Sequence, residues 1–313
     1  MGRPRLDAFQ RLAVATTATT YLLIMVGGLV RAVGAGLGCP DWPKCFGSWV
    51  PPVRADQLPP GFDPLLFNAP LTWTEYLNRL LGVIVGFLIF ATLVAAARAH
   101  RRSRRVLGPT LLAFLLVGFQ GWLGGRVVAH GLAPWIVTAH LVVALVIVSL
   151  LLYATVNAFF PTTAPTPSPE RRRIGRAAGA LLGLTLAQVA VGTQVRGRID
   201  EAARADDLPR AVWLARAGGM DLAHRKASLA VLAGALALLA VVWRRERSPG
   251  WLVGGAAAVA GLTLAQITIG VVLAYLDLPR TAQVAHLTVA SLLLGAETLV
   301  GLLAYRLSEG RAV

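Results

Sequence analysis

The chain has 313 residues, of which 56% are hydrophobic and only 14% charged, and it carries a formal net charge of +15. Globular domains average about 45–50% apolar and about 25% charged residues, so this composition excludes an ordinary soluble protein. The apolar runs are much longer than the roughly 10 residues of a membrane-spanning β-strand. We therefore predict an all-α integral membrane protein.

Eight segments have the length of about 20 apolar residues that a helix needs to cross the hydrocarbon core. In chain order they are 12–32, 72–97, 107–128, 133–158, 175–195, 219–243, 251–275 and 280–305. The first follows a basic stretch, as a signal peptide does, but its apolar run is too long for one. We expect it to be retained as the first transmembrane helix.

The basic residues gather in alternate connections between these segments. In chain order the groups are Arg3, Arg5 and Arg11; Arg98, Arg101, Arg102, Arg104 and Arg105; Arg171, Arg172, Arg173 and Arg176; and Arg244, Arg245 and Arg247. Cytoplasmic loops carry such an excess of positive charge, so both termini are predicted in the cytoplasm, and nucleic-acid binding is disfavoured. Lysine supplies only two of the thirty basic residues, which favours a GC-rich bacterial source and a bacterial plasma membrane.

An internal repeat relates the two halves of the chain. Asn78 precedes His140 by 62 residues, and His224 precedes His286 by the same 62 residues. The offset of 146 residues also aligns Glu75 with Asp221, Arg79 with Arg225, Gln120 with Gln266, and Gly124 with Gly270. Self-similarity at a fixed offset indicates a repeated structural unit, so each half is predicted to be one up-down-up-down bundle.

The first helices of the two halves match at another offset, 165 residues, which aligns Gly27 with Gly192. The 19-residue difference must lie in the connections that follow, 33–70 in the first half and about 197–218 in the second. We therefore predict tandem four-helix bundles related by a pseudo-twofold axis along the membrane normal. Their ranges are 1–160 for the N-terminal unit, 161–170 for a proline-rich linker, and 171–313 for the C-terminal unit.

The repeat places a histidine from each of two helices at one depth near the outer face, as cofactor sites in four-helix bundles do. A lone intramembrane histidine is often a helix–helix hydrogen bond, but the matched pair His224 and His286 favours a ligand site. Zinc needs three or four protein ligands, whereas two imidazoles complete a haem iron. We predict a six-coordinate haem on His224 and His286, and a related site at Asn78 and His140.

Three other ionisable residues are weaker candidates. His100 lies in an arginine run and is expected to be solvated, and His130 lies in a short outer connection. Glu297 follows His286 by eleven residues and therefore lies on nearly the same helix face. Either a proton path or a helix–helix hydrogen bond of the protonated acid would explain it.

Five arginines at outer helix ends are candidate partners for haem propionates, because a planar guanidinium suits carboxylate recognition. They are Arg31, Arg79, Arg126, Arg196 and Arg225. The alternative for each is snorkelling to the membrane interface.

The two cysteines, Cys39 and Cys45, lie in the outer connection 33–70. An even pair at short spacing outside the cytoplasm predicts a disulfide. A C-x-x-C-H motif for covalent haem attachment is absent from the sequence. A structural staple and a redox-active pair remain alternative roles for the two cysteines.

Together these motifs resemble the haem A synthase family over nearly the whole chain. The residues that carry the likeness are Gly27-Gly28-x-x-Arg31, Gly38-Cys39-Pro40-Asp41-Trp42-Pro43-x-Cys45, Glu75-Tyr76-x-Asn78-Arg79, Asp221-Leu222-x-His224-Arg225, Ala139-His140-Leu141 and Ala285-His286-Leu287. The resemblance implies oxidation of the C8 methyl group of haem O to the formyl group of haem A, for cytochrome oxidase biogenesis. It implies a haem B cofactor on His224 and His286, and the substrate haem O, made by haem O synthase, near His140 and Glu75.

The roles of two residues of the first site, Glu75 and Asn78, remain open. Glu75 is either catalytic or a structural partner of Arg79. Many relatives have histidine where this chain has Asn78, so a bis-histidine first site is not implied, and an iron with one protein ligand would keep a position open for chemistry. The rival functions are a di-haem cytochrome that only passes electrons, and a haem or quinol transporter. The electron acceptor, the oxygen source and homo-oligomer formation remain open.

Overall fold

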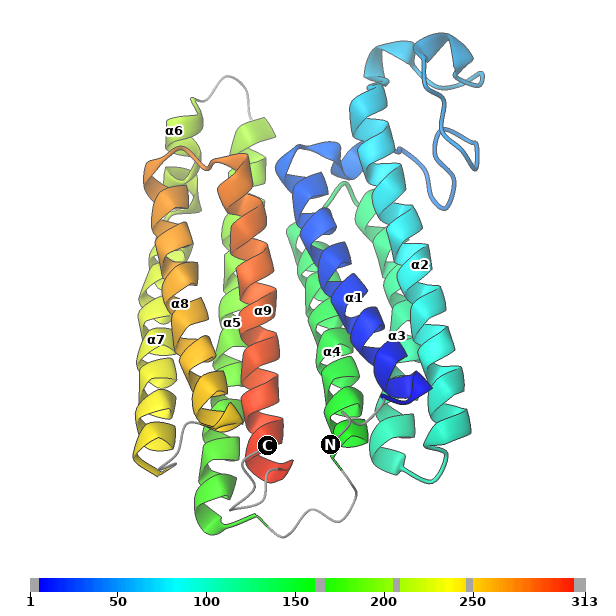
Figure 1. Cartoon of the computed structure of the whole chain (residues 1–313). Helices are drawn as coiled ribbons and strands as arrows, with labels where there is room; N and C mark the ends of the chain where they lie inside the picture. Colours follow the sequence, from blue (N-terminus) through cyan, green and yellow to red (C-terminus); the bar gives the residue numbers. More distant parts are fainter. Residues whose placement is uncertain (1–5, 161–166, 205–208, 246–249, 307–313) are drawn as a thin grey trace.

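The computed structural model describes residues 6–160, 167–204, 209–245 and 250–306. Eight helices within these ranges are long and apolar enough to cross a membrane, which confirms the predicted all-α fold with eight spans (Figure 1). They are α1 (Ala8–Ala32), α2 (Ala69–Ala99), α3 (Arg104–Ala129), α4 (Pro134–Phe159), α5 (Pro169–Arg204), α7 (Gly219–Arg245), α8 (Trp251–Tyr275) and α9 (Arg280–Arg306). Short helical turns occupy the connections: η1 (Ala35–Leu37), η2 (Ala55–Gln57), η3 (Pro64–Leu66), α6 (Arg210–Trp213) and η4 (Ala215–Ala217).

The starts of the first spans follow from local capping chemistry. At α1 the carboxylate of Asp7 accepts the N–H of Gln10 at 2.7 Å, and the Gln10 side chain accepts the N–H of Asp7 at 3.0 Å. This reciprocal capping box satisfies amides that have no partner within the helix. Asn68 caps α2 in a similar way, and Pro134 occupies the first turn of α4, where its missing N–H costs nothing.

The helix α5 is longer than predicted, because it continues beyond residue 195 to Arg204. An ion pair between Arg196 and Asp200, 2.8 Å apart and one turn from each other, stabilises this extension. Val195 and Ile199 are buried against the region of α6 and η4. A helix of 36 residues is about 54 Å long, whereas the hydrocarbon core is about 30 Å thick. The predicted connection 197–218 is therefore partly helical, and α5 projects beyond the membrane.

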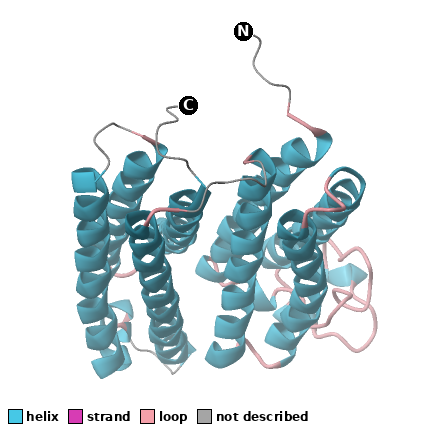
Figure 2. Cartoon of the chain, turned by 90° about the horizontal axis from the view of Figure 1, so that it is seen from below, coloured by secondary structure: helices cyan, strands magenta, loops and turns pink. Residues whose placement is uncertain are grey.

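The long helices lie in two groups, with α1–α4 on one side and α5 with α7–α9 on the other (Figure 1), and two clusters of helices are also seen from below in Figure 2. Helices α1 and α4 of the first group meet α5 and α9 of the second. Apolar side chains fill each group, for example around Val85 and Ile89 in the first and around Val231 and Val259 in the second. The twofold axis that the repeat implies stays a prediction, and part of the predicted linker lies outside the described residues.

Polar contacts join the two groups near one end of the spans. Arg31 of α1 forms an ion pair with Asp200 of α5, with 2.7 Å between Nη2 and Oδ2. The hydroxyl groups of Thr138 on α4 and Thr193 on α5 are 2.6 Å apart. The amide of Gln194 also donates to Thr138, at 2.8 Å. These bonds hold the ends of α4 and α5 together. The predicted site residues lie in or beside these ends.

The prediction that His100 is solvated is wrong. Its ring nitrogen Nε2 lies 3.2 Å from Oδ2 of Asp7, and its ring packs edge-on against Phe9. The side chain is 19% exposed. The arginine run around His100 suggested that it is exposed. However, His100 lies at the end of α2, beside the start of α1, where Asp7 and Phe9 contact it.

Candidate functional site

The predicted ligands of the second site lie together. The imidazole rings of His224 on α7 and His286 on α9 have centroids 6.4 Å apart and an interplanar angle of 64°. A metal ion held between two imidazoles, with bonds of about 2.0 Å to nitrogen, places the ring centroids about 6 Å apart. The spacing of this pair therefore fits two axial ligands of one iron ion.

Glycines on neighbouring helices provide the space that these rings occupy. A Cβ atom at Gly192 of α5 would lie 2.8 Å from Cε1 of His224, which is too close for any real side chain. A Cβ at Gly270 of α8 would lie 3.5 Å from Cε1 of His286. Gly192 is therefore required by the close approach of His224, whereas the distance at Gly270 is an ordinary van der Waals contact.

Hydrogen bonds fix the histidine-bearing turns but leave a nitrogen of each ring free of protein partners. Gln188 donates to the carbonyl oxygen of His224 and Gln120 donates to that of His140, each at 2.7 Å. The Nδ1 atoms of His140, His224 and His286 are buried and have no hydrogen-bond partner. A helix–helix hydrogen bond, the simplest alternative for an intramembrane histidine, is therefore not made at these atoms.

The first site repeats part of this arrangement. A Cβ at Gly124 of α3 would lie 3.4 Å from Cε1 of His140, as at the matching Gly270 of the second half. Asn78 on α2 stands in the position of His224, and its Oδ1 would lie 3.9 Å from a Cβ at Gly27. That oxygen is buried and has no hydrogen-bond partner. The first group of helices thus presents one imidazole and one amide oxygen without a partner at the positions that match the second site.

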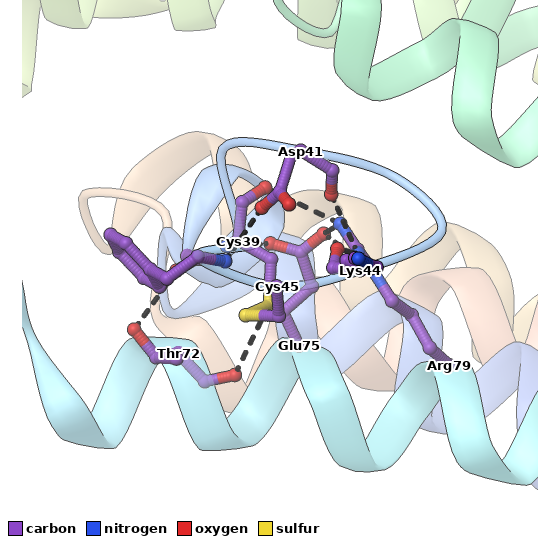
Figure 3. Close-up of polar contacts among 9 residues, drawn as sticks. Cys39, Asp41, Lys44, Cys45, Thr72, Glu75 and Arg79 are labelled. Carbon is purple, nitrogen blue, oxygen red and sulfur yellow. Dashed lines mark hydrogen bonds and ion pairs between the residues drawn. A yellow bond between two sulfur atoms is a disulfide. The ribbon is translucent and has the colours of Figure 1, made fainter. Parts of the chain in front are cut away.

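Glu75 lies one turn before Asn78 and is hydrogen-bonded to the loop between α1 and α2 (Figure 3). Its side chain is only 5% exposed. Oε1 accepts a hydrogen bond from Nε of Arg79 at 3.1 Å, and Oε2 accepts one from the backbone N–H of Cys39 at 2.8 Å. Both carboxylate oxygens therefore have partners, and the predicted ion pair with Arg79 is present.

Arg79 connects the same loop to α2 through three backbone carbonyls. Its guanidinium donates to the oxygens of Asp41 at 2.8 Å, Lys44 at 2.9 Å and Cys39 at 3.3 Å (Figure 3). The carboxylate of Asp41 in turn accepts the N–H groups of Phe46 at 2.6 Å and Gly47 at 2.9 Å. The loop is therefore fixed by hydrogen bonds at both its start and its tip.

The loop also packs closely on the helices of the first site. A Cβ at Gly38 would lie 2.5 Å from the carbonyl oxygen of Leu71, so only glycine allows this approach to α2. The ring of Trp42 lies against Gly125, the neighbour of the glycine that faces His140. Residues of the loop therefore cover the end of α3 beside the first site.

The predicted disulfide between Cys39 and Cys45 is present. The two residues are 0% and 1% exposed, and they share a small apolar cluster with Phe46, Phe62 and Phe67. The disulfide therefore closes the core of the loop and is shielded from solvent.

Four of the five arginines predicted to meet propionates have carboxylate partners in the protein. Arg79 pairs with Glu75, Arg225 pairs with Asp221 at 2.8 Å, and both Arg31 and Arg196 pair with Asp200. Arg126 instead lies 3.2 Å from Nε2 of His130 at the exposed end of α3. Sequence reasoning did not identify Asp200, because its role depends on the unpredicted extension of α5.

Glu297 lies deep in the second group of helices, away from the paired histidines. It is 1% exposed, and its Oε1 accepts a hydrogen bond from Thr185 of α5 at 2.7 Å. Its other oxygen is buried without a partner. The contact with Thr185 agrees with the helix–helix hydrogen bond that was one of the two alternatives for this residue.

Ligand chemistry favours a haem over a bare metal ion at these sites. Within the described ranges, no three His, Cys, Asp or Glu side chains converge in a way that would hold a metal ion. A porphyrin supplies four ligands to iron, so two imidazoles suffice. Two imidazoles from separate helices, with ring centroids 6.4 Å apart, fit that group.

Comparison with known proteins identifies the family of the chain. The COX15-CtaA family model, described as cytochrome oxidase assembly protein, matches residues 10–298. A haem A synthase of Methylobacterium sp. (strain 4-46) is 30% identical, over 94% of this chain and 91% of the relative. The haem A synthase of Methylorubrum populi is 30% identical, over 84% of this chain and 78% of the relative. That of Methylobacterium nodulans is 28% identical, over 89% of this chain and 87% of the relative. The chain belongs to the COX15-CtaA family of cytochrome oxidase assembly proteins.

Proposed function

We propose that this protein is a haem A synthase, an oxidoreductase that converts the C8 methyl group of haem O to the formyl group of haem A. The observation that carries the proposal is the His224–His286 pair, whose centroid spacing of 6.4 Å suits a haem iron in a chain whose relatives are haem A synthases. The reaction supplies haem A for cytochrome oxidase.

His224 and His286 are the proposed ligands of haem B, which supplies one-electron transfer when bound. The proposed substrate site lies in the first group of helices, where His140 is the iron ligand and Asn78 stands opposite in the repeat. Haem O would come from haem O synthase in the same membrane. We place the protein in a bacterial plasma membrane with both termini cytoplasmic and both haem sites near the outer face.

Glu75 is the proposed catalytic carboxylate, because it lies one turn from Asn78 on the same face of α2. A fixed negative charge there would stabilise positive charge that develops on the methyl carbon, or the carboxylate would accept the methyl proton. Its contacts with Arg79 and Cys39 also support a role in anchoring the loop. The two roles predict different variant behaviour, which is set out in the Discussion.

The rival functions account less well for the same features. A cytochrome that only passes electrons should hold both haems with two strong ligands, which Asn78 does not supply. Transporters use discontinuous half-helices near the membrane midplane, whereas each span in the described ranges is one helix from end to end.

The proposal is tested by expressing the chain in a bacterial host that has haem O synthase but lacks its own haem A synthase. Extracted haems are identified by mass. Haem A should accumulate only when the chain is present. Extracts that contain haem O alone, beside a correctly inserted chain, would contradict the proposed activity.

A further inference from the structure

The two sites differ at one pair of matching positions, Asn78 and His224. The repeat aligns these residues at an offset of 146. Each side chain faces a glycine of the first helix of its own group, Gly27 for Asn78 and Gly192 for His224. The two side chains therefore point to equivalent places, one between α1 and α2 and the other between α5 and α7.

The amide of Asn78 does not replace the imidazole of His224 as a ligand. It is one atom shorter, and its oxygen is a hard donor that suits Mg²⁺, Ca²⁺ and Mn²⁺. Haem iron in proteins takes His, Met, Cys or Tyr side chains as axial ligands. An iron bound to His140 therefore has one strong protein ligand where the second site has two.

The other histidines and the cysteines of the first half have partners of their own. His130 interacts with Arg126 at the end of α3, and His100 pairs with Asp7 at the opposite end of the spans. Both cysteines are in the disulfide. Apart from His140 and the two histidines of the second site, no histidine or cysteine of the described ranges is therefore free to ligate this iron.

The surroundings of this position suit a small ligand. Oδ1 of Asn78 is buried and unpaired, and the loop packs Trp42 over the neighbouring end of α3. An amide offers both an acceptor oxygen and two N–H donors, so it can hydrogen-bond to a molecule bound beside it. In haem proteins, hydrogen-bond donors beside an open position of the iron favour the binding of a diatomic molecule.

We propose that the first site keeps one coordination position of its iron open for a small uncharged diatomic ligand, with Asn78 as the hydrogen-bonding group beside it. This inference rests on the proposed function, because the iron is that of the substrate haem. The second site, closed by His224 and His286, takes no such ligand.

Carbon monoxide is the probe. The chain is purified from cells that make haem O, reduced with dithionite and titrated with carbon monoxide, while the extracted haems are counted by mass. About one carbon monoxide per chain should bind, in proportion to the sum of bound haem O and haem A and not to haem B, since bis-imidazole iron has no free position. Asn78→His should reduce carbon monoxide binding about tenfold or more while haem O content is kept. The reciprocal variant, His224→Asn, should add a second binding site.

The possible results either support or contradict the open coordination position. Full haem content with no carbon monoxide binding, or unchanged binding in Asn78→His, would overturn the open position and leave the proposed synthase activity standing. A preparation with haem B but no haem O or haem A, from a chain that also makes no haem A in cells, would contradict both proposals. If His224→Asn loses its haem, the Asn78→His comparison alone remains decisive.

Discussion

Gly192 lies directly against the imidazole of His224. A Cβ at that position would be 2.8 Å from Cε1, 3.4 Å from Nδ1 and 3.5 Å from Nε2. One whole edge of the ring therefore rests on the backbone of α5. With Nδ1 unpaired, packing against this glycine, and not a hydrogen bond at Nδ1, sets the orientation of the ring.

The first prediction is that Gly192→Ala displaces this ring and weakens haem binding at the second site. Adding a methyl group to a closely packed position costs about 1–3 kcal/mol. Since 1.4 kcal/mol is tenfold in affinity, haem B affinity should fall by roughly 5- to 140-fold. Haem titration and the low-spin spectrum measure this effect.

Two other glycines provide the controls for Gly192→Ala. Gly183→Ala on the same helix has no atom within 4 Å of the new methyl group and should bind haem as the wild type does. Gly270→Ala, at 3.5 Å from His286, should have a smaller effect than Gly192→Ala. Equal losses in Gly183→Ala and Gly192→Ala would show that ring packing is not the cause.

The sequence predicts those features that depend on residues in a fixed pattern along the chain. Apolar length defines the eight spans, and the repeat distance identifies His224 and His286 as a pair. Contacts such as Gly192 with His224, or Asp200 with Arg31, depend on how helices rotate and how far α5 extends. The residue pattern of one helix does not specify which face of a neighbouring helix it will contact. These contacts are therefore known only once the helices are packed.

The second prediction concerns the ligands of the second site. His224→Ala and His286→Ala should each abolish the low-spin haem B signal, because one imidazole leaves the iron five-coordinate. The double variant should lose little more than either single variant, since the two residues act on one iron. Insertion should be unaffected, as judged by the amount of chain in purified membranes. A wild-type low-spin spectrum in either single variant would refute the ligand assignment.

The third prediction is that the loop between α1 and α2 faces outward. Leu65 is 91% exposed in that loop, whereas Arg102 lies between α2 and α3 at the opposite end of the spans. Leu65→Cys should react with a membrane-impermeant maleimide in intact cells, and Arg102→Cys only after permeabilisation. The buried native cysteines should stay unlabelled in both variants. The reverse labelling pattern would invert the proposed topology.

The fourth prediction separates the two roles of Glu75. Glu75→Gln keeps an acceptor for the N–H of Cys39 but removes the charge that Arg79 meets. If the carboxylate acts on the substrate, haem A production per folded molecule should fall about 10²-fold or more, with haem O still bound. The measurement is the ratio of haem A to haem O in extracts, normalised to the amount of folded protein.

Asp41→Asn provides the matched control, because it weakens the loop through Phe46 and Gly47 without contacting Glu75. We expect this variant to lose thermal stability and yield while it keeps its turnover per folded molecule. A purely anchoring Glu75 would behave in the same way, since it too would act only through the loop. If Glu75 is catalytic, Glu75→Gln lowers turnover and Asp41→Asn does not. Equal turnover in the two variants would show that Glu75 only stabilises the loop.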